Sequence, residues 1–492
     1  MSGKILLTGG HVVTLDDVLG DFPVGAVLIE DGTIVAVGQA ADISAPDAEV
    51  IDATDTVVIP GMVDTHRHAS MSLTRGLGLD QDLIHFLSNT YLRWFPATSV
   101  EDMKLSALVG ALEALDSGVT TIMDTCEAFH TPEHAEAELQ GLKESGIRSF
   151  YCFGMGQDRY GDHAAGTPGW EARFAHVKRL LAENSDKDAL TQIALQTSIV
   201  GSVPWHNTAA ELKWAKQEGL LSCTHSCGMM NSEATKDILQ RADHDLLIPG
   251  HVYIHCTNLT AQELDLIAES KGKLSLAMES DMQMGMGVPP LRRSIERGIN
   301  PSLSIDTATA IAPDLLSQMR IALQTQRMLD HCEQQRSGAV SMKCEYGVRD
   351  ALVWGTRNGA EAVGLGHRIG TLSPGKRADV VTISNKRFLS PSAYPLGTAI
   401  MHSNGADIDT VIVDGHIRKR DGKLVGHDLD EIRSQAKAGL GRIMENLKGM
   451  RPEMNFEERK EYFKVVERVY RDNVLRSYKD GATALTGWVT PA

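Results

Sequence analysis

The sequence predicts an α/β fold in which a (β/α)8 TIM barrel carries a small β-sandwich formed from both chain ends and a C-terminal helical extension. Two observations predict this fold. Short apolar strands alternate with helical stretches through the middle of the chain. Strand-like segments with Gly-containing turns stand before and after that stretch. The expected domains are residues 1–56 with 366–425 for the sandwich, 57–365 for the barrel and 426–492 for a helical tail.

Both ends of the chain have the pattern of short β-strands. Apolar runs are separated by turn signals such as Gly9-Gly10, Asp31-Gly32 and Asp414-Gly415. The simplest architecture joins the two ends into one β-unit, with the barrel inserted between them. The expected strands are Ile5–Leu7, His11–Leu15, Ala26–Ile29, Thr33–Val37, Val380–Ile383 and Thr410–Val413.

The middle of the chain offers enough strands for a complete barrel. Helical stretches such as Ser106–Leu115 and Ala261–Glu269 separate them. Apolar residues then recur at helical spacing in the tail, so we expect it to pack on the barrel or on a second subunit. The expected barrel strands are Val57–His66, Val119–Thr125, Ile147–Phe153, Gln192–Ile199, Leu220–Thr224, Val252–His255, Lys273–Met278 and Ser302–Ile305.

Composition excludes several classes of protein. The 492 residues carry a formal net charge of −16, which argues against a nucleic-acid partner, since such proteins present a basic face. Seven Cys at irregular spacing argue against a disulfide framework and favour a reducing, cytoplasmic location. The N-terminus lacks the pattern of a signal peptide. The sequence has no apolar run near the roughly 20 residues that a membrane span needs, so we expect no membrane partner.

The strongest local signal is the segment Pro60–His68. Alternate side chains of a strand share a face, so His66 and His68 point the same way and Arg67 points away. At the C-terminal end of a barrel strand, that shared direction is the active-site mouth. Two imidazoles that converge there suit Zn²⁺ or another borderline divalent ion. On its own the pair is also explained by chance among 18 His.

Three further polar residues end predicted barrel strands. His225, His255 and Asp306 each follow a buried apolar run. Polar groups in such places are costly unless they bind something. A hydrogen-bonded core His explains any one of them but explains the whole set poorly. The sequence therefore predicts a metal site at the mouth of the barrel.

With these residues, the chain resembles the amidohydrolase superfamily, and most closely the branch of cytosine deaminase, guanine deaminase and the chlorohydrolase-like triazine hydrolases. The resemblance rests on the PG-x-V-D-x-H-x-H motif, the strand-end residues and the segment Ile369–Val381, and it spans about residues 5–425. It implies a metal-dependent hydrolase of a non-peptide C–N bond in an amide, a urea or a heterocycle, a small-molecule substrate and a homo-oligomer. The resemblance implies that one divalent ion, Zn²⁺ or alternatively Fe²⁺, is ligated by His66, His68, His225 and Asp306.

The resemblance also implies how the site works. Binuclear relatives use a carboxylated Lys after strand four, where this chain has Gln196–Gly201 without a Lys, so a single metal is expected. Bound metal lowers the pKa of water towards about 7. Asp306 then accepts the water proton and passes it to the leaving group. His255 is the expected second-sphere donor, with direct metal ligation as the alternative.

One position departs from the deaminase pattern. Relatives carry H-x-x-E after strand five, whereas here Gly228 stands at the Glu position and cannot transfer a proton. One interpretation is hydrolysis with a leaving group that needs little protonation, such as a halide, a thiolate or an activated amine. Another is a heterocycle aminohydrolase in which Glu279 or Asp281 replaces the missing acid, although both are also explained as surface carboxylates. A non-catalytic scaffold relative is the third.

The loops that follow the barrel strands supply candidate substrate-binding residues. Met and Trp in these loops favour a flat, poorly charged organic substrate, while filler packing under long loops is the alternative. For Cys227, the commoner role is that of a buried, inert thiol. The candidates are Trp94, Gln157, Trp205, His206, Cys227, Met229, Glu279 and Asp281.

Overall fold

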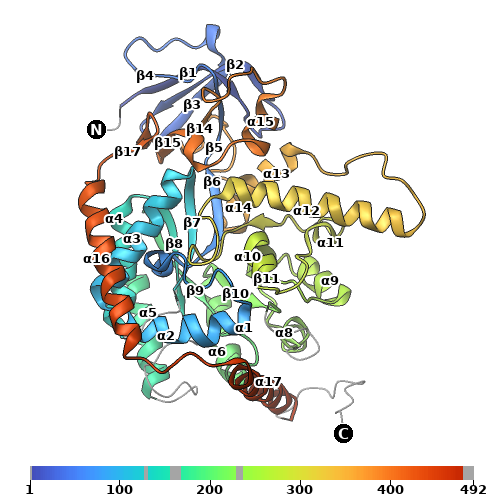
Figure 1. The fold of residues 1–492 in the computed structure, drawn as a ribbon. Helices are drawn as coiled ribbons and strands as arrows, with labels where there is room; N and C mark the ends of the chain where they lie inside the picture. Colours follow the sequence, from blue (N-terminus) through green and yellow to red (C-terminus); the bar gives the residue numbers. More distant parts are fainter. Residues whose placement is uncertain (1–2, 127–130, 156–167, 229–235, 480–492) are drawn as a thin grey trace.

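The computed structural model describes residues 3–126, 131–155, 168–228 and 236–479. Figure 1 shows two sheets, one above the other: a sheet built from both ends of the chain and a barrel surrounded by helices. Strands β1 (Ile5–Val12), β2 (Phe22–Glu30) and β3 (Thr33–Gln39) come from the N-terminal end of the chain. The other strands of this sheet are β4 (Glu49–Asp52), β5 (Thr56–Pro60), β14 (Val380–Ser384), β15 (Ile408–Val413), β16 (His416–Arg420) and β17 (Lys423–Leu424).

Strand β5 joins the two chain ends into one sheet. It pairs with β1 on one side in parallel and with β14 on the other in antiparallel register. The strand order is β17-β16-β15-β14-β5-β1-β2-β3, and β4 pairs with β1 beside this path. This arrangement confirms the expected β-unit from both ends. The exact domain boundaries stay a prediction.

The second sheet is the barrel. Its strands are all parallel and follow one another in chain order. The first and last strands are joined where the Asp306 N–H donates to the His66 carbonyl at 3.0 Å and the His68 N–H donates to the Asp306 carbonyl at 2.8 Å. The strands are β6 (Met62–Arg67), β7 (Val119–Cys126), β8 (Arg148–Gly154), β9 (Thr191–Gln196), β10 (Ser222–Ser226), β11 (Val252–His255), β12 (Lys273–Leu276) and β13 (Ser302–Leu303).

The single strand predicted over Val57–His66 is in fact two strands in two different sheets. The chain passes from β5 to β6 at Gly61. A Cβ at Gly61 would lie 2.1 Å from the Thr120 hydroxyl oxygen, so only glycine fits this crossing. A continuous apolar run does not reveal such a crossing, because both halves are fully buried.

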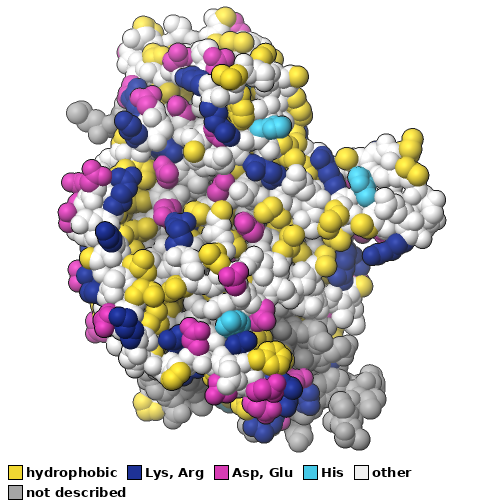
Figure 2. Space-filling model, viewed as in Figure 1, with side chains coloured by type: hydrophobic (Ala, Val, Ile, Leu, Met, Phe, Trp, Pro, Cys, Tyr) yellow, Lys and Arg dark blue, Asp and Glu magenta, His cyan; other side chains and the backbone are white. Residues whose placement is uncertain are grey.

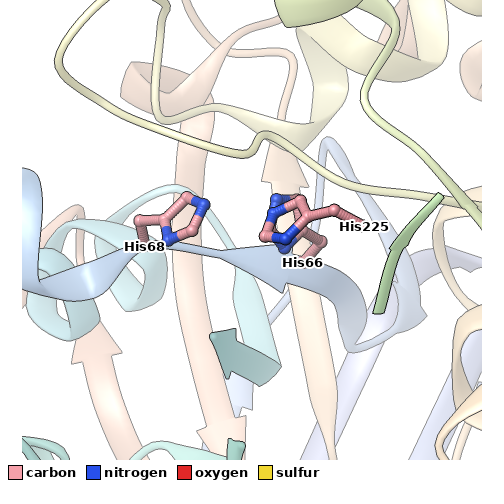
Figure 3. A group of neighbouring side chains, drawn as sticks. All are labelled: His66, His68 and His225. Atoms are coloured by element: carbon pink, nitrogen blue, oxygen red, sulfur yellow. The ribbon is translucent and has the colours of Figure 1, made fainter. Parts of the chain in front are cut away.

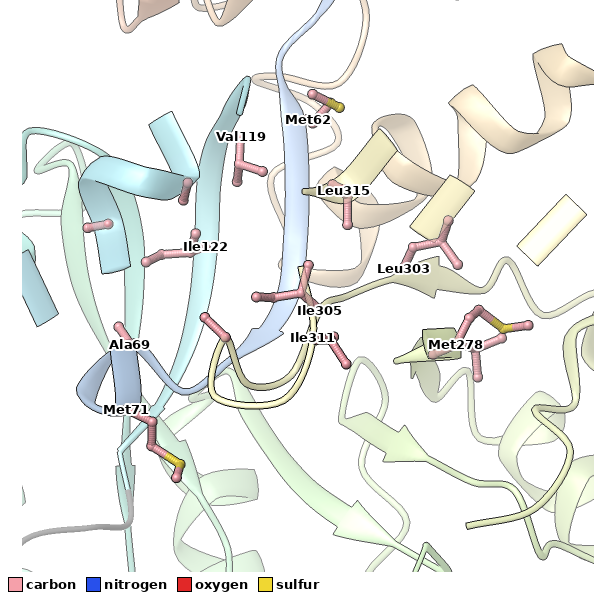
Figure 4. Packing of buried hydrophobic residues seen from close by; sticks show 14 of the residues in the cluster. Met62, Ala69, Met71, Val119, Ile122, Met278, Leu303, Ile305, Ile311 and Leu315 are labelled. Carbon is pink, nitrogen blue, oxygen red and sulfur yellow. The ribbon is translucent and has the colours of Figure 1, made fainter. Parts of the chain in front are cut away.

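Helices cover the barrel and bury its outer face. Figure 4 shows part of the core, in which Met62, Val119 and Ile122 of the strands lie near Ile305 and Leu315. Burial of apolar surface at about 25 cal/mol per Å² is the main stabilising term for such a core. The longest of the barrel helices described, α12 (Leu315–Arg336), projects beyond the barrel in Figure 1.

Two long helices of the tail pack on the barrel. Helix α16 (Leu429–Lys448) contacts α2 and α3, and helix α17 (Phe456–Lys479) contacts α1 and α6. No helix among the described residues is both long and apolar enough to cross a membrane. The remaining helical elements are η1 (Ala40–Asp42), η2 (Ala69–Thr74), α1 (Leu83–His85), η3 (Phe86–Tyr91), α2 (Leu92–Ala97), α3 (Val100–Asp116), α4 (Pro132–Ser145), α5 (Pro168–Glu183), α6 (Trp205–Glu218), α8 (Asp237–Asp243), α9 (Ala261–Glu269), α10 (Met278–Gln283), α11 (Leu291–Ile295), α13 (Val348–Gly355), α14 (Arg357–Ala362), α15 (Pro395–Met401) and η4 (Gly405–Asp407).

Candidate metal centre

The C-terminal ends of three barrel strands, β6, β10 and β13, bring the predicted metal ligands together. His66 lies in β6 and His68 directly follows it, while His225 lies in β10. Figure 3 shows the three imidazoles near one another, beside the β6 and β10 ribbons. Arg67 points away, because its buried guanidinium donates to Asp64 at 2.9 Å.

The donor atoms have the spacing of a metal site. His66 Nε2 lies 3.2 Å, and His68 Nε2 3.3 Å, from the same oxygen of Asp306. Zinc ligands at about 2.0–2.1 Å from the metal stand roughly 3.3 Å apart in a tetrahedron. The donor atoms of His66, His68 and His225 all lie within 4.8 Å of one another, as do those of His66, His255 and Asp306. The residues present therefore fit a divalent ion bound by nitrogen and oxygen.

Neighbouring polar groups contact the Nδ1 atoms of the three imidazoles. The Thr125 hydroxyl lies 3.0 Å from His66 Nδ1, and its carbonyl lies 3.1 Å from His68 Nδ1. The amide of Gln196, at the end of β9, lies 3.3 Å from His225 Nδ1. Contacts at Nδ1 orient the rings with Nε2 towards the centre, which is the usual arrangement around a metal.

Helix α10 supports the remaining two site residues. The Ser280 hydroxyl donates to Asp306 Oδ2 at 2.5 Å, and His255 Nδ1 lies 2.8 Å from Asp281 Oδ1. An ionised carboxylate only accepts hydrogen bonds, so this contact places the proton of His255 on Nδ1 and leaves Nε2 for the site. The short helix therefore positions both predicted catalytic side chains.

Burial sets the charge of the centre. Burial lowers the pKa of His66 to about 3 and the pKa of His225 well below its usual value, so both rings are neutral at pH 7. Burial acts to raise the pKa of Asp306, but the hydrogen bond from His66 and the nearby imidazoles outweigh it and lower that pKa. Neutral imidazoles around a carboxylate are the forms that bind a divalent metal.

The backbone at the site is strained. His255 has a φ of 69° and Asp306 a φ of 71°, and Cys227 and Cys256 also have positive φ. Non-glycine residues in this region cost on the order of 1–3 kcal/mol each and persist only where the surrounding structure imposes them. Such strain clusters at functional sites, and here it accompanies the end of three barrel strands.

A cavity of about 380 Å³ opens over the donor atoms. We call His68, His225, His255 and Asp306 its floor. Most of its wall is apolar, including Met71, Leu83, Met284 and Met286. Eight further lining residues come from η3 and α17, and we call them the roof. They are Phe86, Leu87, Tyr91, Tyr462, Val465, Val466, Val469 and Tyr470.

The structure brings only some of the predicted substrate-binding residues to this cavity. Cys227 lines it, whereas Trp94 is buried against Tyr91 and Phe95, and Trp205 packs against His244. His206 lies exposed at the start of α6. Glu279 accepts from Gln318 at 2.8 Å, and Asp281 lies behind His255. Among the described residues, neither carboxylate lines the cavity. Gln157 and Met229 lie outside the described residues.

Sequence reasoning placed Phe86 and Tyr91 in the pocket, as observed, but missed the part of the roof that α17 supplies and the support from α10. Tyr462, Val466 and Tyr470 are spaced four residues apart, so a helical pattern in the tail was the available signal. Nothing in the sequence, however, indicates which surface that pattern packs against. Ser280 and Asp281 follow a strand in a short helix, where no periodicity distinguishes them.

The comparisons with known proteins agree with this geometry. The model of the amidohydrolase family matches residues 57–418, which is most of the chain. The chain belongs to the amidohydrolase family. It is a metal-dependent hydrolase that acts on carbon–nitrogen bonds of small molecules, as expected. Helices α16 and α17 lie beyond the matched residues.

Curated relatives of this amidohydrolase are named as deaminases. A 5'-deoxyadenosine deaminase of Methanothermobacter thermautotrophicus is 30% identical over 86% of this chain and 94% of its own length. A 5-methylthioadenosine/S-adenosylhomocysteine deaminase of Moorella thermoacetica is 27% identical over 88% of this chain and 98% of its own length.

Solved structures share the fold of this amidohydrolase. An adenosine deaminase of Xanthomonas campestris with bound zinc superposes with a TM-score of 0.78 at 22% identity, covering 89% of this chain and 98% of the other. An atrazine chlorohydrolase of Arthrobacter aurescens complexed with zinc superposes with a TM-score of 0.74 at 20% identity, covering 89% and 100%. They confirm the TIM barrel with its end-formed β-unit.

Proposed function

We propose that this amidohydrolase hydrolytically removes an amino or alkylamino group from a ring carbon of a small, uncharged nitrogen heterocycle. The observation that carries the proposal is the polar floor beneath a mostly apolar cavity. The names of the curated relatives, which are deaminases of adenine nucleosides, support it. The cofactor we assign is one zinc ion held by His66, His68, His225 and Asp306.

Nitrogen donors from three imidazoles and oxygen from one carboxylate favour zinc, although the same set also accepts iron. When bound, zinc lowers the pKa of a coordinated water towards about 7. We assign Asp306 to take the proton that water gives up and to return it to the departing nitrogen. Its second oxygen is held by Ser280, so the carboxylate is fixed in place for this transfer.

His255 is the second catalytic residue in this proposal. It lines the cavity, and Asp281 fixes its ring through Nδ1. Nε2 therefore stands towards the substrate, where it orients the water or stabilises charge that develops on the ring. Gln196, at the end of β9, contacts His225 through its amide, which supports a single-metal site.

Gly228 favours a second candidate function. It lines the cavity, and Asp306 is the only carboxylate among the lining residues that the structure describes. An enzyme with this single acid is suited to displace a group that leaves with little protonation, such as a halide, a thiolate or an activated amine. The two candidates differ in which product is released.

The test is a product-release assay on metal-loaded protein. A panel of aminopurines, alkylamino-triazines, and chloro- and alkylthio-heterocycles is assayed for ammonia, amine, chloride and thiol, and bound metal is measured by mass spectrometry. Ammonia or amine release with about one zinc per chain supports the proposal. Chloride or thiol release alone supports the second candidate. A protein with neither metal nor turnover is the non-catalytic relative, and the proposal is then wrong.

A designed acid distinguishes the candidates further. A Cβ at Gly228 would lie 2.9 Å from Met286 Cε, the movable end of a flexible side chain, and 3.3 Å from Cβ and Cδ2 of His255. The double variant Gly228→Glu with Met286→Ala therefore removes the tightest of these contacts to admit the missing carboxylate, and Met286→Ala alone is its control. If the second candidate holds, the double variant gains about 10²-fold or more in ammonia release from aminated rings. The cytoplasmic location and the homo-oligomer stay predictions, to be tested by cell fractionation and light scattering.

A further inference from the structure

Helix α17 has two different faces. Tyr462, Val466 and Tyr470 lie four residues apart and face the cavity. Charged residues occupy the other side, where Lys464 pairs with Glu461 at 2.7 Å. Figure 2 shows charged side chains of both signs gathered at the bottom of the view, over the position of α17 in Figure 1. The helix is therefore amphipathic, with its apolar side turned to the barrel.

Both ends of α17 are fixed to the barrel. Before the helix, the Asn89 amide donates to the Met454 carbonyl at 2.9 Å and accepts from the Met454 N–H at 2.8 Å. Near its end, Asn473 donates to the Gly201 carbonyl at 2.8 Å. The ring of Tyr470 packs so closely on Gly201 that a Cβ there would lie 2.6 Å from it. These contacts hold α17 as a fixed wall of the cavity.

The rest of the roof comes from the π-helix η3, which carries Phe86, Leu87 and Tyr91 to the cavity. Irregular π-helical turns frequently occur at functional sites. None of the lining residues within the described part of the chain is Lys, Arg or Glu. Among the described lining residues, a charged substituent placed between η3 and α17 would find no side chain of opposite charge to compensate for its lost hydration.

We propose that η3 and α17 form a specificity subsite that takes an uncharged, apolar substituent of the substrate, on the far side of the ring from the reacting carbon. The proposal rests on the proposed function for the identity of the ring, but the apolar subsite itself does not depend on turnover. It predicts a preference for 5'-deoxyadenosine and 5'-methylthioadenosine over S-adenosylhomocysteine, whose side chain is charged. Val466, near the middle of the apolar face, is the residue to change.

Binding of an uncharged probe tests the subsite directly. Wild-type protein is titrated with the fluorophore N-phenyl-1-naphthylamine, beside Val466→Asp and Arg468→Asp. Arg468→Asp puts the same carboxylate on the exposed side of the helix and serves as the matched control. We expect Val466→Asp to weaken probe binding at least about tenfold and Arg468→Asp to leave it unchanged. Equal binding by all three proteins would overturn the subsite, whether or not the protein turns over a heterocycle.

Kinetics then test the specificity. For Val466→Lys, we expect the ratio of kcat/KM for 5'-methylthioadenosine over that for S-adenosylhomocysteine to fall at least about tenfold, mainly through KM. Because this is a ratio within one protein, partial misfolding does not change it. An unchanged ratio in a protein that still turns over both nucleosides overturns the subsite and leaves the proposed function standing. If wild-type protein binds the probe but releases neither ammonia nor amine from any heterocycle, the proposed function fails and the apolar subsite stands.

Discussion

The floor and the roof of the cavity differ in composition, in backbone geometry and in their relation to the family. The floor is polar, lies on barrel strand ends and includes residues held at positive φ, such as His255 and Asp306. The roof is largely apolar, and α17, which supplies five of its eight residues, lies beyond the residues matched by the family. The two regions are joined by the segment after β9, which runs from Gln196 beside His225 to Gly201 beneath Tyr470.

The difference separates two properties of the enzyme. In the proposed function, the floor determines which bond is hydrolysed, because its donor atoms are proposed to hold the metal and carry the proton. The roof determines which molecules are admitted, because it contacts the part of the substrate that does not react. A substitution in the floor should therefore lower kcat, whereas one in the roof should mainly raise KM.

The largest effect is expected from Asp306→Asn. An amide cannot take up the water proton, so we expect kcat to fall by about 10³-fold or more. Ser280→Ala is the matched control, since it leaves the carboxylate but removes its 2.5 Å hydrogen bond, and we expect about a tenfold loss. Steady-state kinetics with metal analysis measures both. Comparable activity of Asp306→Asn and wild type would exclude the proton-transfer role.

Much of the floor was predictable from the sequence, because strand-end positions place side chains by simple geometry. The alternation that put His66 and His68 on one face holds at any strand end. Predicted and observed bounds agree fully for β11, Val252–His255. The prediction for β9 ran on to Ile199, yet the strand ends at Gln196, because the chain turns there towards α6.

The roof was not predictable in the same way. The apolar spacing of α17 shows that one face is buried but not what it is buried against. That depends on contacts between distant parts of the chain, such as Asn89 with Met454 and Gly201 with Tyr470. Trp94 illustrates the same limit, since its position after β6 suggested the cavity and tertiary packing places it in the core.

A smaller effect within the floor is expected from Asp281→Asn. The amide no longer enforces the orientation and tautomer of His255, so we expect kcat to fall about 10- to 100-fold with little change in KM or bound metal. Glu279→Gln is the matched control on the same helix, because its partner is Gln318. We expect it to remain within about twofold of wild type. Equal losses in both variants would mean that α10 acts only as packing.

The free energy of unfolding should depend on pH through Glu211. This residue contacts Ser198, in the segment between floor and roof. Burial raises the pKa of Glu211 to about 7, although the Ser198 N–H and hydroxyl donate to it at 2.7 and 2.9 Å. The folded protein then holds a proton that the unfolded chain releases above about pH 4.3, so stability falls as pH rises towards 7.

Glu211→Gln removes this dependence. We expect the free energy of unfolding of wild type, measured relative to this variant in urea, to fall by about 2–3 kcal/mol between pH 5 and 7.5. Most of the loss should be complete by pH 7, because both states release the proton above that value. Parallel profiles for the two proteins would show that Glu211 is ionised in the fold throughout this range.

The smallest effect is expected from Gly201→Ala, in the segment that connects the floor to the roof. Gly201 has a φ of +93° and lies against Tyr470, so Gly201→Ala both strains the backbone and pushes α17 outward. Gly338→Ala is the matched control, because that residue also has positive φ but nothing within 4 Å of its Cβ position. For Gly201→Ala we expect KM for an uncharged substrate to rise about fivefold, equivalent to about 1 kcal/mol, with kcat and bound metal unchanged. If kcat falls instead, the floor depends on the anchoring of α17, and the division between the two regions does not hold.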